Sequence, residues 1–321
     1  MKTRKVFFLL VWLAGLLPFS ACGPQAEQPS SAGRLRVVAT TTIVADVVLQ
    51  VGADRVDLGV LLPVGSDPHS FEPTPQEIAK VAAAEVVFAN GGGLEEFLAN
   101  LIESAGAQDR VHYVSDGVNF LETGEGDHGS EADGTQEQAA ETGHQHGVDP
   151  HTWTDPNNVR VWVHNIENTL TELDPANAEA YQANAEAYLA ELERLDAWIR
   201  EQVDQVPAAD RKIVSDHGIF GYYAQAYGFE QVGTLIPGYS TLAEPSAQEL
   251  AKIEDAIRDV QVKAIYVGKS VNPSLAARVA ADTGIQLIYI YTGSLSEPGG
   301  EAGTYLDYMR YNTNAFVEPL K

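Results

Sequence analysis

The chain has little cysteine and few basic residues. Cys22 is the only cysteine among 321 residues, so a disulfide within the chain is excluded. Twenty Lys and Arg stand against 45 Asp and Glu, which gives a formal net charge of −25. Such a charge would repel nucleic acid and anionic membrane surfaces, and it would attract a cationic ligand. We therefore expect no nucleic-acid partner.

An apolar run near the start, Val6 to Leu17, is shorter than the roughly 20 residues that a membrane-spanning helix needs. Basic residues precede it at positions 2, 4 and 5. A positive segment before a short apolar run is typical of a secretory signal peptide, which we predict over residues 1–21. The chain is therefore expected to be exported.

Cys22 follows small residues and precedes residues 23–33, a stretch rich in Gln, Pro and Ser that we interpret as a flexible tether. This arrangement resembles the lipobox of bacterial lipoproteins, in which the cysteine is lipidated and becomes the mature N-terminus. Phe19 departs from the usual leucine, so a plain signal peptide with a chance cysteine is the alternative. The predicted location is the outer face of the cytoplasmic membrane, through a lipid anchor, or the periplasm.

From Leu35 on, short β-branched runs alternate with longer amphipathic stretches, which predicts an α/β fold. Capping boxes at Thr74–Glu77 and Ser246–Glu249 mark two helix starts. We predict two α/β lobes, residues 34–172 and 207–321, each with a central, mainly parallel sheet. The predicted strands are Arg36–Ala39, Val56–Leu61, Val86–Ala89, Val111–Val114, Lys212–Ser215, Val232–Leu235, Ala264–Val267 and Gln286–Ile290.

Residues 173–206 are predicted to link the lobes. Within them, Pro175–Val206 has no internal proline or glycine and is rich in Ala, Glu and Leu. Apolar side chains recur there at helical spacing, at positions 189, 192, 195 and 199. This pattern predicts one long helix of roughly 45 Å, a rigid strut unlike the flexible crossing strands of hinge-closing receptors.

An acidic insert, residues 122–149, carries eight carboxylates and neither Lys nor Arg, and it lacks apolar periodicity. This composition predicts a disordered loop within the N-terminal lobe. Its histidines, His128, His144 and His146, are candidate auxiliary ligands of a low-affinity metal store, since imidazole and carboxylate together suit zinc and copper. The alternative is a solvated linker in which the histidines are incidental.

Three further histidines, His69, His151 and His217, are candidate metal ligands. The first two each follow an Asp-Pro pair, which carries the imidazole on stiff backbone. The aspartate, or a nearby backbone carbonyl, could orient the second ring nitrogen. His217 follows a predicted strand, at the edge where open α/β sheets bind ligands. His112 and His164 lack such a setting, so we interpret them as structural.

Four ordered segments resemble the cluster A-I substrate-binding proteins of zinc and manganese ABC importers, the ZnuA and TroA type. They are LPVGSDPHSFEPTPQEIAKVAAAEVVFANG, the acidic insert with DPHTWTDPNNV, SDHGIFGYYAQAYG, and SLSEPGGEAGTYLDYMRYN. The resemblance implies two α/β lobes joined by one rigid helix, a metal at their interface, and ligand roles for His69, His151 and His217. Relatives that resemble manganese carriers usually have a carboxylate at the third position, so His217 points to zinc.

One position departs from that family. Where many relatives carry an aspartate as fourth ligand, this chain has Gly293. Water, Glu72, Glu297 or an insert residue is then left as the possible fourth ligand. Three histidines with water also occur in catalytic zinc sites, which keeps a zinc hydrolase as an alternative. Against it, the chain lacks the His-Glu-x-x-His and Gly-x-Ser-x-Gly motifs.

The sequence thus predicts an extracytoplasmic binding protein and not an enzyme. It is expected to act as a monomer that captures Zn²⁺ as cargo at the lobe interface and delivers it to an ABC permease with its ATPase. A Mn²⁺ receptor of the same family is the main alternative, and a surface adhesin with structural metal is another. Gly268-Lys269-Ser270 mimics the end of a phosphate loop, but an earlier glycine is missing, so we predict a turn.

Overall fold

The computed structural model describes residues 33–122 and 147–321. The predicted signal peptide, Cys22, all but the last residue of the tether, and the three insert histidines lie outside the described residues. Within the described ranges, every helix is too short or too polar to serve as a membrane span. Residues 33–321 belong to one unit, to which the following description refers.

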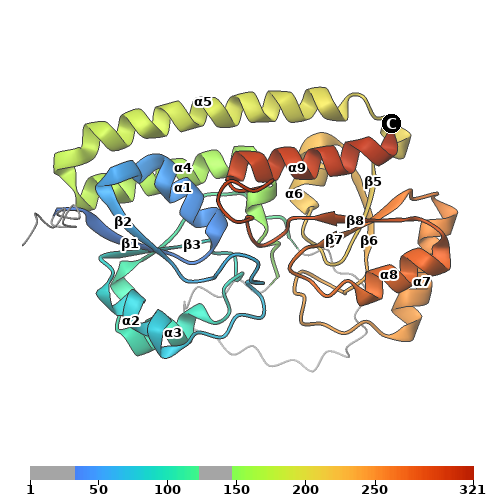
Figure 1. Cartoon of the computed structure of the whole chain (residues 1–321), viewed down its shortest axis with the longest axis horizontal. Helices are drawn as coiled ribbons and strands as arrows, with labels where there is room; N and C mark the ends of the chain where they lie inside the picture. Colours follow the sequence, from blue (N-terminus) through green and yellow to red (C-terminus); the bar gives the residue numbers. More distant parts are fainter. Residues whose placement is uncertain (1–32, 123–146) are drawn as a thin grey trace, which may run out of the picture. The chain divides into compact units, whose positions relative to one another are not determined.

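The N-terminal lobe is built on a parallel sheet with strand order β2-β1-β3-β4. Its strands are β1 (Leu35–Ala39), β2 (Val56–Val60), β3 (Val86–Ala89) and β4 (Val111–Tyr113). The helices α2 (Pro75–Ala83) and α3 (Leu98–Ala105) pack on one face, and α1 (Thr42–Gly52) and α4 (Pro156–Leu173) cover the other (Figure 1). Coverage on both faces explains why every residue of β3 is buried.

The C-terminal lobe repeats this architecture with strand order β6-β5-β7-β8, again all parallel. Its strands are β5 (Lys212–Ser215), β6 (Glu230–Thr234), β7 (Ala264–Gly268) and β8 (Gln286–Ile290). The helices α7 (Ala247–Asp259) and α8 (Ser274–Thr283) pack on one face, and α6 (Gly221–Tyr227) and α9 (Tyr305–Val317) lie on the other. Both lobes therefore present the carboxyl ends of parallel strands, where ligands of such sheets bind.

The helix α5 (Ala178–Val203) contacts α1 and α4 in the N-terminal lobe and α6 and α9 in the C-terminal lobe. Figure 1 shows it running along the helices of both lobes. Its 26 residues span about 39 Å, and its buried face repeats at helical spacing. The members of that face are Tyr181, Ala185, Tyr188, Leu192, Leu195, Ile199 and Val203.

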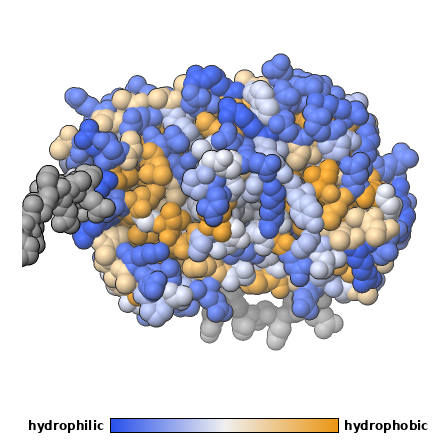
Figure 2. All heavy atoms as spheres, viewed as in Figure 1, coloured by the Kyte–Doolittle hydropathy of each residue, from blue (hydrophilic) through white to orange (hydrophobic). Residues whose placement is uncertain are grey.

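One continuous hydrophobic core joins the two lobes. It contains Val47 and Trp162 from the N-terminal lobe, Leu192 from α5, and Tyr266 and Phe316 from the C-terminal lobe. The face drawn in Figure 2 is largely hydrophilic, with apolar patches that are separated from one another. Because the lobes share one close-packed core, wide rigid-body opening would expose much apolar surface.

The predicted two-lobed α/β fold with a long linking helix is confirmed. Both predicted capping boxes form, at Thr74 and at Ser246. The linking helix is shorter than predicted because Pro175–Asn177 form a 3-10 turn and the helix ends at Val203. The strand β6 begins at Glu230, two residues before the predicted start, because its pairing with β5 extends into polar positions.

Candidate metal centre

His69 lies in the loop between β2 and α2 and is half-buried. The Asp67 carboxylate accepts a hydrogen bond from the His69 backbone N–H at 3.0 Å through Oδ1. Its other oxygen accepts a hydrogen bond from the Thr241 hydroxyl, which comes from the β6–α7 loop of the C-terminal lobe. Asp67 therefore fixes the backbone of His69 and ties the two lobes together, and it leaves the His69 ring unheld.

His151 is fully buried between Pro150 and the 3-10 turn Thr152–Thr154 that precedes α4. Asp149 Oδ1 lies 2.8 Å from His151 Nδ1 and accepts the His151 backbone N–H at 2.9 Å. The predicted role of this aspartate in orienting the ring agrees with this geometry. An ionised carboxylate at Nδ1 leaves the Nε2 lone pair free for a metal.

His217 follows β5 and is also buried. Asp216 Oδ1 lies 2.6 Å from His217 Nδ1 and accepts the backbone N–H of His217 at 2.7 Å. Asp216 Oδ2 accepts the backbone N–H of Gly268 at 2.6 Å, at the end of β7. Two adjacent strands thus hold the carboxylate that orients this ring.

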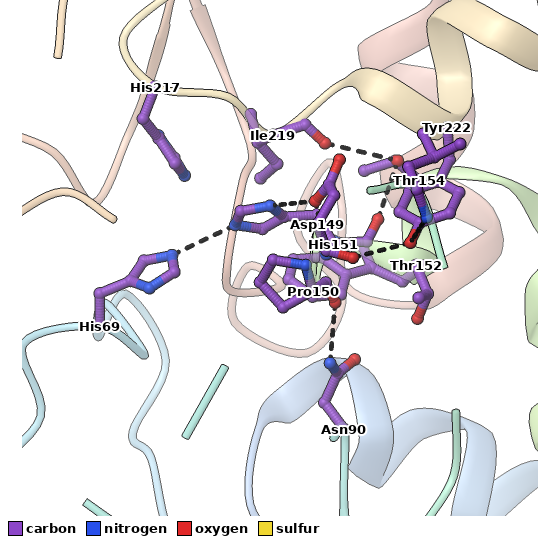
Figure 3. Close-up of polar contacts among 12 residues, drawn as sticks. His69, Asn90, Asp149, Pro150, His151, Thr152, Thr154, His217, Ile219 and Tyr222 are labelled. Atoms are coloured by element: carbon purple, nitrogen blue, oxygen red, sulfur yellow. Dashed lines mark hydrogen bonds and ion pairs between the residues drawn. The ribbon is translucent and has the colours of Figure 1, made fainter. Parts of the chain in front are cut away.

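The three imidazoles converge (Figure 3). One nitrogen of each lies within 4.8 Å of the corresponding nitrogens of the others, and Nε2 of His69 is 3.2 Å from Nε2 of His151. The ring centroids are 5.2 to 5.5 Å apart. Among residues 33–122 and 147–321, this is the one group of His, Cys, Asp or Glu side chains close enough to hold a metal ion.

Burial controls protonation at this site. Burial, with the neighbouring His151 and His217, lowers the pKa of His69 to about 3. Burial also lowers the pKa of His151 well below its usual value and raises the pKa of Asp149 to about 8. The His69 ring is therefore neutral at pH 7, and the Asp149–His151 pair holds one proton that a bound cation would displace.

The walls of the site contain both polar and apolar side chains, and they come from both lobes. Lining residues besides the histidines are Asp67, Pro68, Trp153, Ile219, Thr241, Val271, Thr292 and Gly293. Glu72 and Glu297, predicted as possible fourth ligands, are exposed and are not brought into the histidine group. Gly293 lies in the wall but has no side-chain donor. The described residues therefore supply three nitrogen ligands.

A second layer of hydrogen bonds supports His151. The Asn90 side chain donates to the Pro150 carbonyl at 2.8 Å, and the Tyr222 hydroxyl donates to the Asp149 carbonyl at 2.7 Å (Figure 3). The buried Glu95 carboxylate in turn accepts the Asn90 backbone N–H at 2.6 Å. Sequence reasoning identified none of these supporting residues. The Asn-Gly-Gly-Gly run that follows the buried strand β3 was the available signal.

The remaining sequence features take structural places. His112 lies in β4 near the Thr169 hydroxyl, and His164 lies exposed on α4 near Glu167. Gly268-Lys269-Ser270 forms the predicted turn, closed by a hydrogen bond from the Val271 N–H to the Gly268 carbonyl. The Lys269 ammonium packs over the ring of Tyr291, at 4.1 Å from its centroid. The turn is therefore held by the packing of Lys269 on Tyr291.

Residues 37–319 match the family model described as zinc-uptake complex component A, periplasmic (ZnuA). The manganese-binding lipoprotein MntA of Halalkalibacterium halodurans is 33% identical over 319 residues, 99% of each chain. The manganese ABC transporter substrate-binding lipoprotein PsaA of Streptococcus anginosus is 31% identical over 324 residues, again 99% of each. The structure of the periplasmic zinc binding protein TroA from Treponema pallidum has a TM-score of 0.77 and 24% identity, covering 90% of this chain and 99% of that one.

Two parallel-sheet lobes, a single connecting helix and converging imidazoles define a metal-binding substrate-binding protein of an ABC transporter, a class without enzymatic activity. The chain belongs to the ZnuA family, among lipoproteins of the TroA and PsaA type. Because the similar proteins are lipoproteins or periplasmic binding proteins, the chain works outside the cytoplasm.

Proposed function

We propose that this chain binds one divalent transition metal through His69, His151 and His217 and delivers it to the permease of an ABC importer driven by its ATPase. The observation that carries the proposal is the convergence of three imidazole nitrogens within 4.8 Å. Two of the rings are held at Nδ1 by buried aspartates. We further propose that the mature chain is a monomer held at the membrane by a lipid on Cys22.

We propose manganese as the transported metal. Two curated relatives that match nearly the whole chain carry manganese in their names, at 33% and 31% identity. These names favour the alternative prediction over the zinc preference that the third histidine indicated. Manganese at this site would need oxygen ligands from water, because the described residues supply only nitrogen donors.

Zinc is the second candidate, and one observation favours it. All three converging donors are imidazoles, and no carboxylate belongs to the group. Imidazole suits zinc, which is stable with four ligands, whereas carboxylate, carbonyl and water oxygens suit manganese. The donor set and the names of the relatives therefore point to different metals.

Release has to use small movements, because the lobes share one core. The hydrogen bond between Asp67 and Thr241 joins the two lobes beside His69. We propose that docking on the permease shifts these loops, withdraws His69 and lowers the affinity of the site.

Titration calorimetry of the soluble mature chain with zinc and with manganese tests the site. One tight site should disappear when His69, His151 and His217 are all replaced by Ala. His164→Ala is the matched control, because this exposed histidine lies on α4 away from the site. Unaltered tight binding by the triple variant, or no binding by the parent chain, would refute the proposal.

The cargo needs a separate measurement, because zinc binds most nitrogen sites more tightly than manganese whatever the cell transports. Cellular manganese and zinc contents of a deletion strain should be compared before and after complementation. A manganese deficit that the wild-type gene restores and the triple variant does not would support manganese. A zinc deficit alone would move the assignment to zinc.

A further inference from the structure

Gly293 lies in the loop between β8 and α9 and is buried against the ring of Pro68, the residue before His69. A Cβ atom at position 293 would lie 2.5 Å from Pro68 Cδ and 2.9 Å from Pro68 Cγ. Neither distance is compatible with carbon atoms in contact. The requirement for glycine here is steric, and it arises from the close approach of the two lobes.

Hydrogen bonds keep this loop from retreating. The Ser294 hydroxyl accepts the Gly65 backbone N–H at 2.8 Å, and the Leu295 N–H donates to the Thr42 hydroxyl at 2.9 Å. Both bonds run from the β8–α9 loop to the N-terminal lobe. A side chain at position 293 could be accommodated only by straining or breaking these ties.

The preceding residue, Thr292, is confined as well. The Tyr308 hydroxyl donates to its carbonyl at 3.0 Å. On the other side, a Cβ atom at Gly268 would lie 2.4 Å from the Thr292 hydroxyl oxygen. Thr292 and Gly293 are therefore wedged between β7 and Pro68, and both line the histidine site.

We propose that Gly293 acts as the seal of the metal site. Its missing side chain lets the β8–α9 loop pack directly on Pro68, and this contact sets the rate at which the cargo leaves. Gly293 gives no donor atom, so its role is closure and not coordination. The proposal rests on the proposed function, because it concerns release from the same three histidines.

The test uses Gly293→Ala, which adds one methyl group and no donor. Zinc-loaded soluble protein is mixed with excess chelator, and the dissociation rate is followed by stopped flow. We expect release about tenfold faster than from the parent chain, since overpacking a closed contact weakens it. Gly59→Ala is the matched control, because a Cβ there would meet Val38 Cγ2 at an ordinary 3.6 Å.

A second pair of variants tests the partner. Pro68→Ala removes Cγ and Cδ, so in that background Gly293→Ala should accelerate release much less. If Gly293→Ala alone does not fold, the comparison of Pro68→Ala with the double variant takes its place, and near-equal rates in that pair support the seal.

Three results would overturn the seal. These are parental release from Gly293→Ala, equal acceleration by Gly59→Ala, and the full effect of Gly293→Ala retained in the Pro68→Ala background. A parent chain that binds neither metal would refute the proposed function itself. That outcome is distinguishable from a parent that binds and a Gly293→Ala variant that releases normally.

Discussion

The three histidines are supported in two different ways. His151 and His217 are buried, and a buried aspartate contacts Nδ1 of each ring. His69 is half-buried, and its aspartate holds the backbone N–H. Among the hydrogen bonds of the described residues, the His69 ring takes part in one, with His151. The site therefore combines two fixed ligands with one adjustable ligand.

This difference suggests an order of events. We expect a metal ion to meet the fixed pair first and His69 to complete the site from the loop between β2 and α2. Because that loop also carries the bond from Asp67 to Thr241, moving it would withdraw His69 and loosen the lobe contact together. The following predictions test the contrast between the fixed and the adjustable ligands.

The largest effect should come from His151→Ala. Both His151→Ala and His69→Ala should lose tight metal binding, by on the order of 1000-fold, because each removes one of three donors. Only His151→Ala should also destabilise the metal-free protein, by about 2 kcal/mol, because it leaves the Asp149 carboxyl buried without its ring partner. Calorimetry and thermal unfolding in chelator measure the two effects, and equal destabilisation by both variants would contradict the contrast.

The next effect separates the two supporting aspartates. Asp149→Asn should weaken metal binding by roughly 10- to 100-fold, the usual effect of removing a carboxylate that orients a ligating histidine. Asp67→Asn should weaken it by less than about threefold, since the amide oxygen can still accept the His69 N–H. Parallel titrations with the same metal give both values. A larger loss in Asp67→Asn would reverse the assignment of fixed and adjustable ligands.

Protons should compete with the metal at the fixed ligand His151 and its partner Asp149. The pKa of Asp149, raised to about 8 by burial, means that a metal must displace a proton from the Asp149–His151 pair below that pH. Affinity should therefore rise by about tenfold per pH unit between pH 6 and 8. His69, with a pKa of about 3, adds no competition in this range. Calorimetry in buffers of different ionisation enthalpy should count about one released proton, and Asp149→Asn should abolish it.

The smallest effect is expected from the acidic insert. Replacing residues 122–147 by a short glycine linker should change the affinity of the tight site by no more than about twofold. The two ends of the insert are joined close to the fixed ligand His151, because the Asp149 N–H donates to the Leu121 carbonyl at 2.8 Å. Titration of the deletion variant should still give one tight site. Loss of that site would show that the insert supplies a necessary ligand.

Much of the fold could be predicted because its signals are local. Buried strands such as β3 and β5 read as short β-branched runs, and both capping boxes are four-residue patterns. The boundaries of β6 and the ends of α5 depend on pairing and packing with distant residues, which a local pattern does not contain. The bounds of helix α4 were not predicted, although Asp155 and Pro156 give it a capped start.

The histidines of the site could be proposed because Asp-Pro-His is a local motif and His217 follows a strand. The residues that support these histidines could not be proposed from the sequence. Thr241 reaches Asp67 from the opposite lobe, and Asn90 reaches Pro150 from a separate loop. The contact between Gly293 and Pro68 likewise exists only in the folded chain, so the sequence showed a missing donor and not a packed seal.

The common core of the two lobes has a practical consequence for building a zinc or manganese sensor from this protein. A pair of fluorescent proteins fused to distant surface points should report little, because separating the lobes would expose the core that they share. A reporter inside the site is better placed. Trp153 lies 5.2 Å, centroid to centroid, from the His151 ring, so its intrinsic emission should respond to occupancy without any attached label.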